Sequence, residues 1–303
     1  MKQVKCSLLR KPLATVIGAT VFLVGMSTQA TEPCDDFGEC KVLIEINSSD
    51  GDIGFHFLGD ADDLRAMRID GPNGEKVFEN RAFGPLRDQF LTESFGESAE
   101  PPCWFEEGEE EDWDDVVTLR DFVDQWEAGT YQFSGKGEEG EKLAGETELT
   151  FDLPAAPKEV NFDGTNITWI AGDDLGNCAP LDSDDAADNG VEPISEVIDI
   201  ISDPAGVTVA AFEVVMEPDV EDGDPVGNLV YSIRVPGDTL VVDVPALYLA
   251  SLPADTPVKI EVGAIGEDDN ATFTEVDGFC INEDEGCEEE EEEVEEEEEE
   301  EEE

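Results

Sequence analysis

The sequence predicts an all-β protein built from two antiparallel β-sandwich domains. Short apolar segments alternate with turn signals along most of the chain, as where "KVLIEI" is followed by "NSSDGD". Within these segments apolar and polar residues alternate, which is typical of half-buried strands. A single segment, "TLRDFVDQW" (118–126), has the apolar spacing of a short helix.

Residues 1–30 are expected to be a signal peptide. Three cations, Lys2, Lys5 and Arg10, precede an apolar run over 13–26, and "STQA" supplies a small-residue cleavage site. The run is too short for a membrane span, and no later stretch approaches the roughly 20 apolar residues that a spanning helix needs. We therefore expect an exported protein, extracellular or periplasmic, with no membrane span.

Six of the seven cysteines follow the expected signal peptide. An even number in an exported chain favours disulfides over metal thiolates. The spacing favours two short-range pairs and one long-range pair: Cys34 with Cys40, Cys280 with Cys287, and Cys103 with Cys178. Other pairings of the six remain open. The absence of C-x-x-C excludes a zinc ribbon or a thioredoxin-like site.

The segment 31–154 is predicted to be an antiparallel β-sandwich of roughly seven strands with one short helical insertion. Within it, "AMRIDGPNGEKVFE" (66–79) reads as a hairpin closed by a Pro-Asn-Gly turn. In the helix, Thr118 and Asp121 have the spacing of a capping box. The proline-containing "LPAAP" (153–157) is expected to be a linker at the end of this domain.

His56 is the only histidine of the chain and follows two aspartates in "SSDGDIGFHF" (48–57). Strand alternation places Ile53, Phe55 and Phe57 on one face and His56 on the other, less buried face. Nearby aspartates should favour the charged imidazole. We interpret His56 as a structural or surface residue rather than as part of a site.

The run "LPADTPVKIEVGAI" (252–265) is the most informative stretch of the second half. It resembles the loop and penultimate strand of a fibronectin type III domain: a leucine, a proline-bearing turn, a threonine, and then alternating apolar residues. Trp169 corresponds to the core tryptophan of that family, while Val258 and Phe212 stand where the family usually has tyrosines. The resemblance implies a second, immunoglobulin-like sandwich domain over 157–281, with an accessory role in binding partners or spacing domains.

The chain has 16 basic and 79 acidic residues, and its formal net charge at pH 7 is −63. Such a surface repels nucleic acid and anionic membranes, because phosphate binding needs clustered Lys and Arg. It suits high salt or divalent cations, which screen the self-repulsion. The polyglutamate tail, 282–303, has no apolar area to bury and is expected to be disordered.

The sequence contains no recognisable catalytic motif. One histidine excludes the H-E-x-x-H zinc motif, and no G-x-S-x-G is present to pair a nucleophilic serine with His56. Carboxylates are so numerous that no spacing selects the acid pair of a glycosidase. We therefore expect that the protein is not an enzyme.

Calcium is the strongest cofactor candidate, because acidic loops between strands can supply the oxygen ligands that it requires. The first choice is "DSDDAADNG", whose acids are dense and close to a glycine turn: Asp182, Asp184, Asp185 and Asp188. Three further acidic loops, 50–52, 60–63 and 219–224, are weaker candidates. None matches the EF-hand pattern. The alternative is that all of these loops are solvated turns.

Together these observations predict an exported, non-enzymatic binding or surface-associated accessory protein, stapled by disulfides and with calcium as its candidate cofactor. The partner would be a protein or a carbohydrate. Trp104, Phe105 and Trp113 offer a stacking surface for a sugar or a peptide. Two alternatives remain: a carbohydrate-acting enzyme or carbohydrate-binding module, and a structural spacer.

Overall fold

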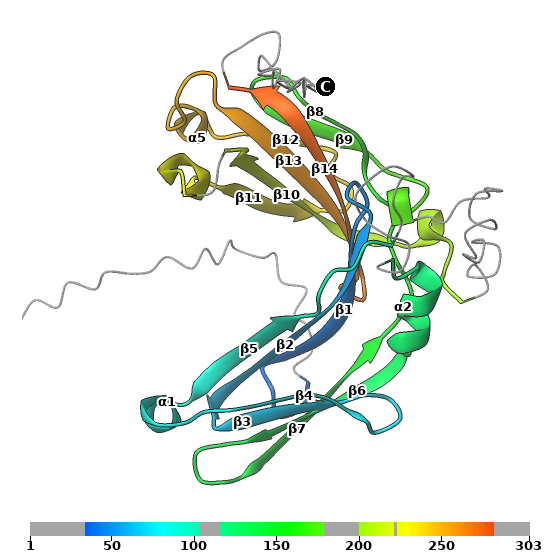
Figure 1. Ribbon diagram of the computed structural model, residues 1–303, viewed down its shortest axis with the longest axis vertical. Helices are drawn as coiled ribbons and strands as arrows, with labels where there is room; N and C mark the ends of the chain where they lie inside the picture. Colours follow the sequence, from blue (N-terminus) through cyan, green and yellow to red (C-terminus); the bar gives the residue numbers. More distant parts are fainter. Residues whose placement is uncertain (1–33, 104–115, 179–199, 221–222, 282–303) are drawn as a thin grey trace, which may run out of the picture.

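The computed structural model describes residues 34–103, 116–178, 200–220 and 223–281. One large sheet of seven strands runs through both halves of this part of the chain, in the order β11-β10-β13-β14-β1-β2-β5 (Figure 1). Its strands are β1 (Glu39–Asn47), β2 (Asp52–Leu64), β5 (Leu91–Glu97), β10 (Val209–Pro218), β11 (Tyr231–Pro236), β13 (Pro257–Gly266) and β14 (Ala271–Cys280). The fold is a sandwich-like all-β arrangement, as predicted.

Two smaller sheets cover one face of the large sheet (Figure 1). The N-terminal one contains four strands in the order β4 (Lys76–Arg81), β3 (Ala66–Asp70), β6 (Gly129–Lys136), β7 (Lys142–Leu149). The C-terminal one contains three strands in the order β12 (Val241–Asp243), β9 (Asn166–Ile170), β8 (Lys158–Phe162). The expected hairpin over 66–79 is formed by β3 and β4.

Each small sheet encloses a separate hydrophobic core against the large sheet. Ile46 belongs to the N-terminal core and Phe212 to the C-terminal core. Both lie in one cross-strand row of the large sheet, which runs through Thr272 and Ala264. Directly opposed residues share a face of a sheet. The two cores therefore lie on the same side of the large sheet, and its other side faces away from both.

Short helices connect some of the strands. They are α1 (Pro85–Gln89), α2 (Leu119–Gln125) and α5 (Ala246–Leu249), with 3₁₀ turns η2 (Gly176–Cys178), η3 (Pro204–Gly206) and η4 (Pro225–Asn228). The expected helix is α2, and the hydroxyl of Thr118 accepts a hydrogen bond of 3.2 Å from the Asp121 amide at its first turn. Its apolar face packs on the large sheet, where Trp126 stacks on Phe55 with ring centroids 3.9 Å apart.

The two halves of the chain are joined by a pairing of β1 with β14, which is parallel although the other strand pairs are antiparallel in the part that the structure describes. The Ser48 amide, just after β1, donates a 2.8 Å hydrogen bond to the carbonyl of Phe273. The Ser48 hydroxyl also lies 3.1 Å from that of Thr274. The large sheet is thereby continuous across the middle of the molecule.

The segment 153–157, expected as a linker, is buried throughout. The amide of Ala156 donates a 2.8 Å hydrogen bond to the carbonyl of Asp174, and a side chain at Gly172 would collide with the Ala156 carbonyl. This stretch therefore passes through packed protein. The expected division into domains at 154 and 157 stays a prediction.

Two of the three expected disulfides are present, Cys34 with Cys40 and Cys103 with Cys178. The third pair includes Cys287, which lies outside the described residues, as do the expected signal peptide and the tail. Within the residues described, none of the helices is both long and apolar enough to cross a membrane.

Candidate functional site

The large sheet curves around its side opposite the two cores, which we call the concave face (Figure 1). The side chains of this face line a hollow. The hollow has a volume of about 570 Å³ and is lined by residues of strands β1, β2, β10, β11, β13 and β14, of the turns after β1 and β13, and of the segment after β5. In β1 the lining residues alternate with core residues, because Lys41, Leu43 and Glu45 face the hollow while Val42 and Ile44 are buried in the core. The pleat of the sheet thus separates a packed face from an open one.

The hollow is strongly acidic. Its charged lining residues are eight acids, Glu45, Asp50, Asp52, Glu100, Glu213, Glu261, Asp269 and Glu275, and three bases, Lys41, Lys259 and Arg234. The excess of acids over bases attracts cations and repels anions. Among the described lining residues only Phe273 is aromatic.

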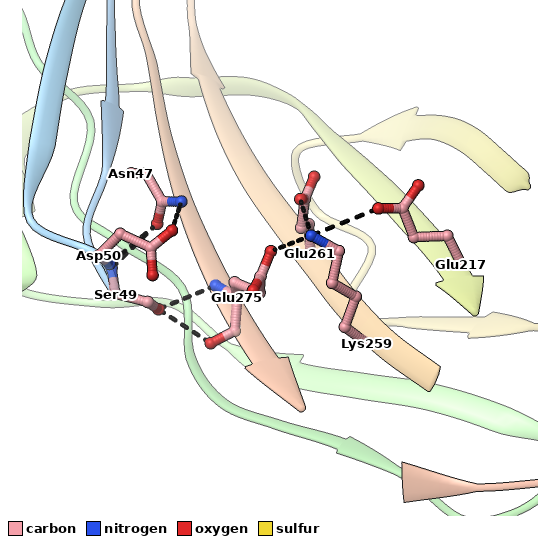
Figure 2. Close-up of polar contacts among 7 residues, drawn as sticks. All are labelled: Asn47, Ser49, Asp50, Glu217, Lys259, Glu261 and Glu275. Atoms are coloured by element: carbon pink, nitrogen blue, oxygen red, sulfur yellow. Dashed lines mark hydrogen bonds and ion pairs between the residues drawn. The ribbon is translucent and has the colours of Figure 1, made fainter. Parts of the chain in front are cut away.

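Lys259 lies at the centre of one group of these acids (Figure 2). Its Nζ atom is 3.0 Å from Oε2 of Glu275, 3.4 Å from Oε1 of Glu217 and 3.9 Å from Oε1 of Glu261. The hydrogen bond to Glu275 raises the pKa of Lys259, so the ammonium stays charged. Burial, followed by the hydrogen bond that protonated Glu261 donates to Glu275, raises the pKa of Glu261 to about 7. The ammonium group of Lys259 thus lies close to three carboxyl groups.

The turn after β1 is fixed to β14 by side-chain contacts (Figure 2). The Ser49 hydroxyl donates to the carbonyl of Glu275 and accepts from its amide, both at 2.9 Å. Within the turn, the Asn47 amide group donates a 2.8 Å hydrogen bond to Oδ2 of Asp50. These contacts hold Asp50 at the rim of the hollow.

A second group of titratable side chains joins Glu45, His56 and Glu100 near the β2 side of the concave face. Each offers one donor atom, and the three atoms lie within 4.8 Å of one another. His56 Nε2 is 3.2 Å from Oε1 of Glu100. Glu45 lies opposite Gly54, and His56 is two residues farther along β2. The cluster thus combines an imidazole with two carboxylates from three separate segments.

The position of His56 corrects part of the sequence interpretation. The imidazole does lie on the face opposite Phe55, since it pairs across the strands with Leu43 of the hollow. It is buried, however, with 6% of its surface exposed. The segment that follows β5 continues alongside β2, where Ile53 donates a backbone hydrogen bond to Pro101, and this path brings Glu100 over the ring.

Two carboxyl groups at this end of the hollow hold protons more tightly than usual. Burial, with the charges of Glu100 and Asp50, raises the pKa of Asp52 to about 6. Burial also raises the pKa of Glu45, although His56 opposes this shift. Like charges that crowd together disfavour ionisation, so this end of the hollow has unsatisfied negative charge.

The structure places the expected calcium ligands as follows. Asp182, Asp184, Asp185 and Asp188 lie outside the described residues, and so do the aromatic residues Trp104, Phe105 and Trp113. Asp50 and Asp52 line the hollow. Within the described ranges, Glu45, His56 and Glu100 form a group whose donor atoms are close enough together to hold a metal ion, and this group was not predicted. Calcium in the loop 182–190 stays a prediction.

Sequence reasoning missed the acids of the hollow, although a signal was present. Four of the acids are glutamates that interrupt runs rich in apolar residues: Glu45 in β1, Glu213 in β10, Glu261 in β13 and Glu275 in β14. Each stands at an outward position of the strand alternation. A common face follows only from the pairing of β1 with β14, which no local pattern indicates.

Neither a protein-family model nor a curated protein matches the chain. Among solved structures, fibronectin(III)-like modules of Clostridium thermocellum CbhA are 8% identical, with 79% of this chain and 93% of that chain covered and a TM-score of 0.20. The BSP domain of a biofilm-associated protein is 10% identical, with 80% of this chain and 29% of that chain covered and a TM-score of 0.21. A bacterial ice-binding adhesin of 1.5 MDa is 13% identical, with 78% of this chain and 62% of that chain covered and a TM-score of 0.19. Likenesses at this level carry no argument about function.

Proposed function

We propose that the protein is an exported, non-enzymatic accessory protein that binds a positively charged protein segment on its concave face. The observation that carries this proposal is the hollow of about 570 Å³ with eight acids and three bases on one sheet. Charge complementarity of this kind speeds encounter with a cationic partner and rejects anionic ones. Because five of the eight acids project from paired strands, their positions are fixed before a partner arrives, which lowers the entropic cost of binding.

Export is supported by the two disulfides, which persist in oxidising compartments. In the C-terminal half, three strands pack against four around Trp169 and Phe212, whose ring centroids are 5.3 Å apart. This arrangement supports a fibronectin type III-like assignment for that half, and with it a binding role. Fold alone does not define a ligand, so the concave face carries the argument.

A carbohydrate-acting role is the second candidate function. The raised pKa values of Asp52 and Glu261, about 6 and about 7, are of the kind that a general acid requires. Sugar sites, however, are commonly lined by aromatic rings, and Phe273 is the aromatic residue among the described lining. A cationic protein segment therefore fits the hollow better than a sugar.

The test is calorimetric titration of the full chain with octalysine in about 0.15 M NaCl, where long-range charge effects are screened. EDTA is present, so that metal ions do not compete. The titration is done at about pH 8, above the raised pKa of Glu261, where a variant with Glu45, Glu213, Glu261 and Glu275 changed to Gln removes four charges from the concave face. The matched control removes four exposed charges from the β6 to β7 hairpin and β7: Glu138, Glu139, Glu141 and Glu148, each changed to Gln.

Both variants have the same net charge and keep the tail. We expect the concave-face variant to bind octalysine at least about tenfold more weakly than the control, since several close charge pairs are lost. Equal affinity in the two variants would mean that binding follows net charge or the tail, and would contradict the proposal. Thermal unfolding of both variants checks that the fold is retained.

A further inference from the structure

We propose that Glu45, His56 and Glu100 form a binding site for a divalent transition-metal ion of the Zn²⁺ type. The three donor atoms come from β1, β2 and the segment after β5, and they lie within 4.8 Å of one another. The inference stands on this geometry alone. It does not depend on whether the concave face binds a cationic partner.

The ligand chemistry selects the class of metal. An imidazole nitrogen with two carboxylate oxygens suits Zn²⁺ and its neighbours, whereas Ca²⁺ prefers a shell made wholly of oxygens. Ligand atoms lie about 2.0 to 2.2 Å from zinc, so the three donors must draw slightly closer around the ion. The Glu100 side chain is 42% exposed and can make this adjustment, while the His56 ring is buried and stays in place.

Gly54 provides an independent sign that the donors are brought together over β2. A Cβ atom at this position would lie 3.0 Å from His56 Nε2, 2.9 Å from Cγ of Glu100 and 3.1 Å from its Oε1. A side chain at this position would therefore force the imidazole of His56 and the carboxylate of Glu100 to shift. The backbone is bare at the point where the two donors meet.

The charges around the cluster favour a bound cation. Within the described ranges, the lysine and arginine ion pairs involve other acids and leave Glu45, Asp52 and Glu100 without one. Asp52 also lines the hollow and adds to its negative potential. Carboxylates that are partly removed from water and lack a lysine or arginine partner are costly, and a divalent ion would relieve that cost.

Because His56 is the only histidine, its imidazole reports on the site without interference from the acidic tail. The test is a two-bond ¹H–¹⁵N spectrum of the full chain during titration with Zn²⁺, repeated with Ca²⁺. We expect one equivalent of Zn²⁺ to shift the Nε2 resonance of His56, and Ca²⁺ at the same concentration to leave it unchanged. An imidazole that does not respond to excess Zn²⁺ would overturn the proposal and leave a plain ion pair with Glu100.

Variants assign the other ligands. Glu45→Gln and Glu100→Gln should each weaken Zn²⁺ binding at least about tenfold, as loss of a metal-site contact does, whereas the control Glu148→Gln on β7 should not. Gly54→Ala should also weaken binding, because it displaces two donors. Thermal unfolding in EDTA verifies that each variant is folded. Unchanged affinity in Glu45→Gln and Glu100→Gln would contradict the three-ligand site even if His56 alone responded to zinc.

Discussion

Glu261 of β13 and Glu275 of β14 lie directly opposite each other on the concave face, which brings their carboxyl groups within reach of each other. Two carboxyl groups can hydrogen-bond only if one of them keeps a proton. Burial and the hydrogen bond to Glu275 raise the pKa of Glu261 to about 7, from an ordinary value of 4.5. Lys259 Nζ lies 3.0 Å from Oε2 of Glu275. A proton is thus retained on the concave face close to neutral pH.

This proton makes the stability of the protein depend on pH. Between about 4.5 and about 7 the folded chain holds a proton on Glu261 that the unfolded chain has released. The free energy of unfolding must therefore decrease as the pH rises through this window. The contribution of Glu261 to stability is fully present below the window. Asp52, with its pKa raised to about 6, contributes in the same direction. Thermal unfolding of the full chain across this pH range should show a falling midpoint.

Glu261→Gln mimics the protonated form and should remove part of the pH dependence. We expect the variant to be more stable than the wild type at pH 8 by on the order of 1 kcal/mol, after allowance for solvent screening of this partly exposed group. Near pH 4 the two should be alike. Glu148→Gln, on an exposed position of β7, is the control. An unchanged slope in Glu261→Gln would show that the concave-face proton is not held there.

Asn270 is buried, with 1% of its surface exposed, and connects the two halves. Its Oδ1 accepts a 2.8 Å hydrogen bond from the amide of Ile44, and its Nδ2 donates to the carbonyls of Thr150 and Asp152 at 3.1 and 3.3 Å. Asn270→Ala should cost about 3 kcal/mol, because several buried backbone groups lose their partners. Urea unfolding measures the loss. The exposed Asn228→Ala should change stability by less than about 0.5 kcal/mol, and an equally small loss in Asn270→Ala would contradict this role.

The two disulfides should contribute unequally to stability. Cys103 and Cys178 are separated by 75 residues in sequence, and Cys34 and Cys40 by 6. In the chain-entropy account, a longer closed loop restricts the unfolded chain more. We expect replacement of both cysteines by serine to cost about 4 kcal/mol for the long-range pair and about 2 kcal/mol for the short-range pair. Urea midpoints that place the two variants in the reverse order would contradict this expectation.

The features that depend on local pattern could be predicted from the sequence. Alternation of apolar residues places β10 over Val209–Pro218, and the spacing of Thr118 and Asp121 locates the start of α2. Cysteine spacing identifies the pairs Cys34 with Cys40 and Cys103 with Cys178. Each of these follows from residues close together, or from simple counting.

The candidate site could not be predicted in the same way, because it depends on non-local register. Glu45 faces Ala271 across a parallel pairing whose partners are more than 200 residues apart in sequence. Glu100 reaches His56 only because the chain after β5 continues alongside β2. The burial of His56 likewise depends on that path, and strand alternation alone gave the correct face with the wrong exposure.

The central claim is that the concave face is the binding surface, and mapping the contact by NMR tests it most directly. The ¹⁵N-labelled full chain is titrated with octalysine in about 0.15 M NaCl, and amide shifts are followed along the whole chain. We predict that the shift changes gather on β1, β10, β13 and β14, around Glu45, Glu213, Glu261 and Glu275. Changes confined to the glutamate tail, or spread evenly over the small sheets, would contradict the account.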